Sequence, residues 1–167
     1  MKAILLGLLM SGSLFASTSA FALDKPAGDT ILTVTGHITN TNVSGGAAFD
    51  LKMLEGLDGR KASMQTPWTE GMTEFSGPYL RAVLKAAGAT GKTLKVKAIN
   101  DYAAEVPMED ADKLDTILAV RMNGDEMSVR DKGPIFLIYP FDKDKSIYNE
   151  KYFSRSVWQI KEIEVVE

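Results

Sequence analysis

The side chains in this sequence best suited to chemistry are carboxylates that stand close to aromatic rings. Asp101 directly precedes Tyr102, and Glu70 follows Trp68 by two positions. A carboxylate can accept two hydrogen bonds at once, and an aromatic ring offers a broad apolar face. The same residue types also have structural uses. Asp101 could cap a turn, as Asn-Asp pairs often do, and a tryptophan could fill the edge of a core.

Several kinds of reactive group are missing from the sequence. It contains no cysteine, and His37 is its single histidine. No Gly-x-Ser-x-Gly motif supplies a serine nucleophile, and no glycine-rich loop is suited to phosphate. Asp142 and Asp144 lack the spacing of a calcium loop, which favours a solvated hairpin tip at residues 142–146. The sequence therefore predicts neither catalytic residues nor metal ligands.

The first 22 residues have the pattern of a secretory signal peptide. Lys2 provides the positive charge, residues 4–15 are apolar, and Ala20-Phe21-Ala22 fits a signal-peptidase site. The alternative, an N-terminal membrane anchor, needs about 20 apolar residues. We expect cleavage after Ala22, a domain spanning residues 23–167, periplasmic localisation and no insertion into the membrane.

Charge and length limit the remaining possibilities. The formal net charge is −3, and no stripe of basic residues runs along the chain. Nucleic acids and anionic lipid surfaces are therefore poor partners for this protein. A chain of 167 residues, less the predicted signal peptide, is long enough to bury the core of one domain without disulfides.

Hydrophobic periodicity predicts a single α+β domain with mixed or antiparallel sheets. Asp50 is the expected cap of a short helix within residues 49–57, and Ser76 that of a helix that ends at Gly88. A third helix is expected at residues 108–114, and Asn123-Gly124 is a strong hairpin signal. Strands are expected at residues 31–38, 61–66, 93–99, 103–106, 117–122, 135–139 and 157–166.

Several short motifs between Gly77 and Val165 resemble the molybdopterin-binding domain of sulfite-oxidase-type enzymes. They occur in the same order as in that family: Phe75-Ser76-Gly77-Pro78-Tyr79-Leu80 with Val83-Leu84-Lys85-Ala86-Ala87-Gly88, Asn100-Asp101-Tyr102 with Val106-Pro107, Ile117-Leu118-Ala119-Val120 with Met122 to Met127, Asp131-Lys132-Gly133-Pro134, and Val157-Trp158. The resemblance implies a sulfite-oxidase-like fold with mixed β-sheets and a few short helices.

The chain departs from the family where the cofactor would be held. In the family a cysteine ahead of a tryptophan binds molybdenum; Trp68 aligns with the tryptophan, and the cysteine position falls at Met64 or Gln65. Lys132 and Phe136 align with the histidine and arginine that hold the cofactor's phosphate. Trp158 replaces a family lysine. The resemblance therefore implies loss of the metal ligand and of anion contacts, with a gain of stacking surface.

This pattern is similar to that of secreted, non-catalytic members of the superfamily. The similarity implies a periplasmic protein that binds a reduced, unphosphorylated pterin of the tetrahydropterin type, without molybdenum. It would report to the periplasmic domain of an inner-membrane regulator of cyclic-di-GMP. A ligand-free interaction scaffold and a molybdopterin-dependent oxidoreductase remain as alternatives. The residues expected to bind the pterin are Trp68, Glu70, Asp101, Tyr102, Lys132 and Trp158.

Overall fold

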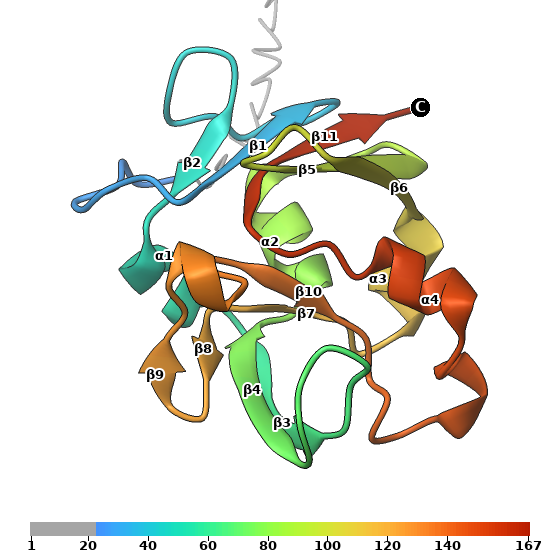
Figure 1. Ribbon diagram of the computed structural model, residues 1–167. Helices are drawn as coiled ribbons and strands as arrows, with labels where there is room; N and C mark the ends of the chain where they lie inside the picture. Colours follow the sequence, from blue (N-terminus) through green and yellow to red (C-terminus); the bar gives the residue numbers. More distant parts are fainter. Residues whose placement is uncertain (1–22) are drawn as a thin grey trace, which may run out of the picture.

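The computed structural model describes residues 23–167, which fold into three β-sheets with short helices (Figure 1). The predicted signal peptide, residues 1–22, lies outside the described residues. Within residues 23–167, no helix combines the length and the apolar character needed to cross a bilayer. The expected α+β class with mixed sheets is confirmed.

The largest sheet has five strands in the order β2-β1-β11-β5-β6. The first strand of the chain runs parallel to the last, with Val34 opposite Ile163, and the other neighbours are antiparallel. The first and last strands therefore lie side by side in the sheet. The strand bounds are β1 Leu32–Gly36, β2 Ala47–Phe49, β5 Thr93–Ala98, β6 Ala103–Pro107 and β11 Ile160–Val166.

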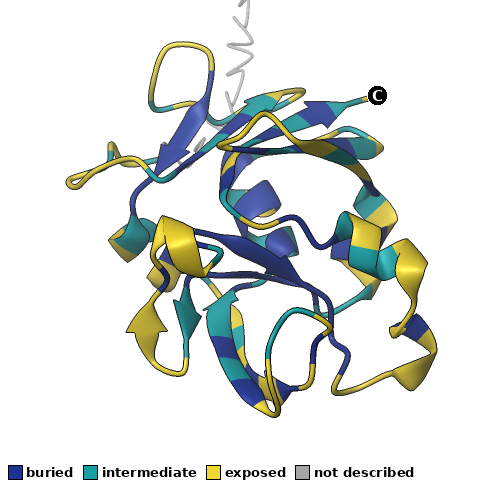
Figure 2. Ribbon diagram, in the orientation of Figure 1, coloured by how far each residue is buried: buried dark blue, intermediate teal, exposed yellow. Residues whose placement is uncertain are grey.

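Two smaller sheets lie on the other side of helix α2, Leu80–Ala87 (Figure 1). One is the β7–β10 pair, and the other has the order β3-β4-β8-β9. Figure 2 shows β7 and β10 as buried, and they form the centre of the core together with the buried face of α2. The strands are β3 Gly59–Met64, β4 Thr73–Pro78, β7 Ile117–Ala119, β8 Arg121–Met122, β9 Asp125–Glu126 and β10 Phe136–Ile138.

The predicted helix ends are partly confirmed. Asp50 caps α1, Leu51–Glu55, by accepting a hydrogen bond from the Met53 amide, and Gly88 ends α2 with φ of 66°. Ser76 is not a cap, because it lies in β4 and pairs with Lys61 of β3 and Arg121 of β8. Ladder hydrogen bonds thus continue up to Pro78, and α2 begins only at Leu80.

The segment before the last strand differs most from expectation. Instead of a hairpin tip at residues 142–146, the chain forms a turn and the 3₁₀ helix η2, Lys145–Ile147. Helix α4, Glu150–Arg155, follows, and no helix was expected in this segment. The last strand consequently begins at Ile160 rather than Val157. The other helices are α3, Met108–Lys113, and the 3₁₀ helix η1, Val129–Asp131.

Candidate ligand-binding cleft

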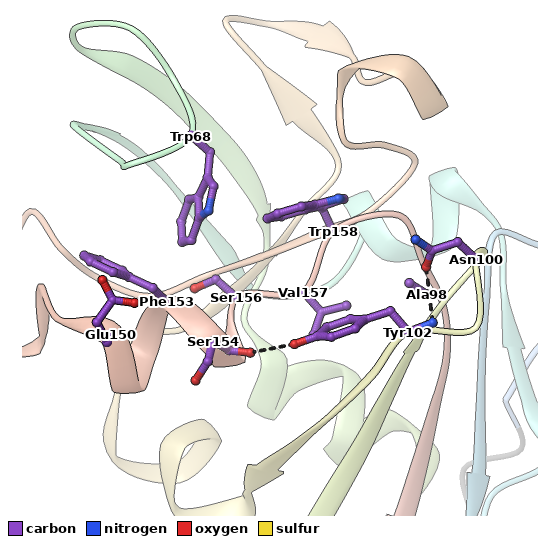
Figure 3. Close-up of a pocket in the computed structure, with 10 residues that line it drawn as sticks. All are labelled: Trp68, Ala98, Asn100, Tyr102, Glu150, Phe153, Ser154, Ser156, Val157 and Trp158. Carbon is purple, nitrogen blue, oxygen red and sulfur yellow. Dashed lines mark hydrogen bonds between the residues drawn. The ribbon is translucent and has the colours of Figure 1, made fainter.

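An aromatic cleft of about 450 Å³ opens beside α4 (Figure 3). Its walls come from the loop between β3 and β4, the turn between β5 and β6, helix α4, and the residues that lead into β11. This volume falls in the range of small-molecule sites, roughly 300–1,000 Å³. The lining residues are Trp68, Ala98, Asn100, Tyr102, Glu150, Phe153, Ser154, Ser156, Val157 and Trp158.

Four aromatic rings lie around Trp68, and three of them meet it edge to face. The ring centroids of Phe136, Phe153 and Trp158 lie 5.4, 5.6 and 6.0 Å from that of Trp68, all in edge-to-face geometry. Phe136 is fully buried, whereas Trp158 is 38% exposed. Edge-to-face contacts fix the rings with respect to one another. The cleft therefore has a rigid aromatic wall, part of which remains open to a ligand.

Local hydrogen bonds hold the two tryptophans in place. The hydroxyls of Thr66 and Thr69 lie 2.8 Å apart, and the Trp68 amide donates to Thr66 Oγ1 at 3.3 Å. Next to Trp158, the Gln159 amide donates to the Lys132 carbonyl, while the Gln159 carbonyl accepts from the Ile99 amide. Both rings thus project from backbone that is tied to its surroundings.

Helix α4 is anchored to the core through a buried polar network. The Arg155 guanidinium donates to Asp110 Oδ2 at 2.8 Å, and the Tyr139 hydroxyl donates to the same oxygen at 2.7 Å. Tyr152 packs edge-on against Tyr139, with centroids 5.0 Å apart. Burial and the Asp110 carboxylate raise the pKa of Tyr139, so its hydroxyl stays protonated and keeps donating. The network fixes the position of the α4 wall.

Polar groups flank the aromatic wall. The Tyr102 hydroxyl donates to the Ser154 carbonyl at 3.4 Å, which links the β5–β6 turn to α4. Asn100 Oδ1 accepts from the Tyr102 amide, so the amide nitrogen of Asn100 is available as a donor. Among the described residues, no side chain forms a hydrogen bond or ion pair with the Glu150 carboxylate. The cleft thus offers one carboxylate, one amide donor and several rings.

The structure brings together three of the six residues expected from sequence: Trp68, Tyr102 and Trp158 all line the cleft. Glu70 is exposed on the β3–β4 loop and does not line it. Lys132 ends η1 with φ of 71°, and its carbonyl accepts a hydrogen bond from the amide of Gln159, the residue after Trp158. These two residues therefore lie outside the lining.

Asp101 also lies outside the cleft lining, although its neighbours Asn100 and Tyr102 belong to it. Its φ of 66° places it in the turn between β5 and β6, and its side chain is 90% exposed. Its carboxylate accepts from Lys161 at 2.9 Å, and this hydrogen bond lowers the pKa of Asp101. Asp101 therefore has a structural place in the turn, but the side chain that accepts a hydrogen bond from a turn amide is that of Asn100 and not, as the alternative expected, that of Asp101.

Helix α4 supplies the lining residues that sequence reasoning missed, namely Glu150, Phe153 and Ser154. A signal was present: Asn149 is a favoured N-cap residue, and its side chain accepts from the Lys151 amide. Glu150 in the first turn and Arg155 in the last also suit the helix dipole.

Comparison with known families gives one match. The family model described as the oxidoreductase molybdopterin-binding domain matches residues 52–167. A search of curated proteins found no match. The family match begins inside α1, yet β1 and β2 pair with the same sheet as β11, so the domain in this chain begins before the matched region.

The side chains present do not fit the molybdenum that this family's description implies. The sequence has no cysteine to supply a thiolate, and at the aligned position Met64 is buried while Gln65 is exposed. Within residues 23–167, no three His, Cys, Asp or Glu residues are grouped so as to hold a metal ion. At the position aligned with the family's phosphate-binding arginine, Phe136 is fully buried below the cleft. The donor set suits neither a soft metal nor a phosphate.

Proposed function

Because the chain belongs to the oxidoreductase molybdopterin-binding domain family and has its sulfite-oxidase-like fold, we propose that it binds a free, reduced and unphosphorylated pterin without catalysing a reaction. The ligand occupies the cleft between Trp68, Trp158 and Phe153. In this proposal the family's pterin-binding architecture is kept, whereas its metal chemistry is lost.

The observation that carries this proposal is the composition of the cleft. Its wall consists of aromatic rings, of which Trp158 is partly exposed, and its lining contains no lysine or arginine. A flat heterocycle gains about 1–3 kcal/mol for each aromatic ring on which it stacks. A phosphate, in contrast, would lose its hydration on entering the cleft without gaining a cation to pair with, and this costs free energy. A neutral, flat pterin is the family-related ligand that this lining favours.

The proposal includes a partner and a compartment. The protein is secreted to the periplasm, where the loaded form docks on the periplasmic domain of an inner-membrane regulator of cyclic-di-GMP. The apolar side chains around the mouth of the cleft support a docking role. Ile99, Tyr102 and Val129 are 44%, 52% and 50% exposed. Gln159 bonds to the backbone of both Ile99 and Val129, so these two side chains come from neighbouring segments.

The direct test is to identify what the protein carries. Protein secreted to the periplasm of a molybdenum-replete host is purified and denatured without oxygen, and the released molecules are analysed by fluorescence and mass spectrometry. A pterin in near-stoichiometric amount is the expected result. Trp158→Ala should weaken pterin binding by about 10- to 100-fold, because it removes a partly exposed stacking ring of the wall.

Two outcomes would contradict the proposal. If no pterin is released and none binds when reduced pterins are added anaerobically, the ligand-free scaffold becomes the better description. If metal analysis of the same preparation finds stoichiometric molybdenum, the protein is an oxidoreductase with a ligand other than cysteine. Either result is decisive, since each alternative predicts a different content of the same sample.

A further inference from the structure

Glu150 carries the one full charge among the ten residues that line the cleft. Two other carboxylates close to the cleft are engaged: Asp110 with Arg155 and Tyr139, and Asp101 with Lys161. No such partner exists for Glu150 within residues 23–167. An unpaired carboxylate beside aromatic rings is a strong acceptor for a ligand that brings its own donors.

The position of Glu150 on α4 places its side chain next to the aromatic wall of the cleft. It precedes Phe153 by three residues and Ser154 by four, so the three side chains lie on one side of the helix. Figure 3 shows the Glu150 carboxylate next to Phe153, the ring that packs against Trp68. A heterocycle stacked within this wall would therefore present one of its edges to Glu150.

The opposite end of the cleft has a different character. Figure 3 shows Asn100 on the far side of Trp158 from Glu150, while the Tyr102 ring reaches back to the Ser154 carbonyl of α4. Since Asn100 Oδ1 is engaged by the Tyr102 amide, its amide nitrogen is left to donate. The cleft is thus polarised, with an acceptor at the α4 end and a donor at the β5–β6 turn.

We infer that Glu150 is the specificity-determining residue of the cleft and accepts from an amino group and an adjacent ring N–H of the ligand. This inference rests on the proposed function and narrows its ligand class. The ligand is a 2-amino-4-oxo heterocycle whose donor edge faces α4 and whose substituent extends towards Asn100. A 2-oxo analogue would place an acceptor against the carboxylate, and a phosphate would meet a like charge.

The test compares two ligands that differ at one position. Anaerobic calorimetry measures binding of a tetrahydropterin and of the tetrahydrolumazine with the same side chain, in which oxygen replaces the 2-amino group. Hydrogen bonds to a charged group contribute about 1.5–3 kcal/mol, so wild-type protein should prefer the pterin by about 10- to 100-fold. Glu150→Gln should abolish that preference, chiefly by weakening pterin binding.

A matched variant separates the role of Glu150 from general charge. Glu105→Gln removes an exposed carboxylate from β6 that does not line the cleft, and it should keep the wild-type preference. Because Glu150 is exposed, Glu150→Gln should fold normally, which thermal denaturation checks.

The possible failures are distinguishable. If pterin and lumazine bind equally well to wild type and to Glu150→Gln, the inference is overturned while pterin binding stands. If Glu150→Gln loses affinity for both ligands equally, Glu150 does not read the amino edge, and the inference again fails. If neither ligand binds wild type, the proposed function fails and the inference fails with it.

Discussion

The centre of the core and the wall of the cleft are built in opposite ways. In β7 and β10 every residue is buried, and α2 buries Leu80, Val83, Leu84 and Ala87 against them. Helix α4, in contrast, has no fully buried residue and is held by four ring contacts and one ion pair. The core is fixed by close packing, whereas the cleft wall depends on a few directional contacts.

This difference explains why family membership gives the fold more directly than the ligand. The motifs that carry the resemblance include Gly77, Leu80 and Ile117, which all belong to the core around α2 and β7. Glu150 and Phe153, which line the cleft, lie between the motifs, in a segment that none of them covers. The packing of this family is thus retained in a chain whose cleft has a different chemistry.

The largest effect is expected from a methyl group added in the core. In Gly77→Ala the new Cβ would lie 2.0 Å from the Leu118 carbonyl oxygen, a backbone atom of β7 that cannot move independently. We expect a loss of about 4 kcal/mol or more in the free energy of unfolding, measured by chemical denaturation. This would be a large part of the stability of a typical domain.

The matched control for this variant is Gly28→Ala, where the nearest atom to the new Cβ is Asp50 Oδ2 at an ordinary 3.6 Å. Its stability should change little. Equal stability of Gly77→Ala and wild type would show that β4 and β7 can separate, and the contrast between a closely packed core and a wall held by a few contacts would be lost.

The second prediction concerns the ion pair that anchors α4. Arg155→Met leaves Asp110 with the Tyr139 hydroxyl as its remaining side-chain partner, in a site where both charged groups are mostly buried. We expect a loss of roughly 2 kcal/mol in stability, less than for an orphaned buried charge because Asp110 keeps one hydrogen bond. Pterin affinity should fall as well, because the Phe153 and Glu150 side of the cleft loosens.

Lys113→Met provides the control for Arg155→Met. It removes a cation from an exposed pair with Glu109 on α3, and neither stability nor ligand affinity should change measurably. If Arg155→Met loses stability but binds pterin as tightly as wild type, the position of α4 does not control the cleft.

The fold was predictable from sequence where local signals agreed with the tertiary structure. Asp50 and Gly88 mark helix ends, and Asn123-Gly124 forms the β8–β9 hairpin, because cap and turn chemistry act over a few residues. The prediction that Ser76 caps a helix was wrong. A serine before an apolar stripe resembles a helix cap, but the backbone of Ser76 pairs with two strands of a sheet. Pairing between strands that are distant in sequence cannot be predicted from the residues next to Ser76.

The site was predictable for its aromatic residues and less so for its charges. Trp68, Tyr102 and Trp158 reach the cleft because their segments come together in the family fold. Asp101 was a plausible ligand group by type, but its side-chain direction depends on one residue with positive φ and on Lys161, 60 positions away. Six-residue α4 has little helical periodicity, so its Glu150 escaped notice.

The third prediction concerns the pH dependence of stability at Asp50, the residue that caps α1. Asp50 accepts hydrogen bonds from the Gly28, Met53 and Ala27 amides, and these lower the pKa of its carboxyl in the folded state. A carboxyl with a lowered folded pKa stabilises the protein above its unfolded pKa of about 3.9. That contribution is lost as the pH falls through the folded pKa.

Asp50→Asn should therefore be less stable than wild type at pH 7, with a melting temperature lower by several degrees. The difference between the two proteins should shrink as the pH falls below about 4, because wild type then loses the contribution of its ionised carboxyl. Melting temperatures measured side by side across this range provide the check. A difference that stays constant with pH would mean that the charge of Asp50 does not stabilise the fold.

The smallest effect is expected at Asp101, and it tests which carboxylate belongs to the cleft. Asp101→Asn removes the charge that pairs with Lys161 yet keeps a side chain suited to the positive φ. Because the pair is exposed, stability should hardly change, and pterin affinity measured by calorimetry should stay within about twofold of wild type. A loss of tenfold or more here, with none in Glu150→Gln, would return the ligand role to Asp101. It would also mean that the β5–β6 turn rearranges on binding, so that the few directional contacts of the cleft wall would not hold this turn in place.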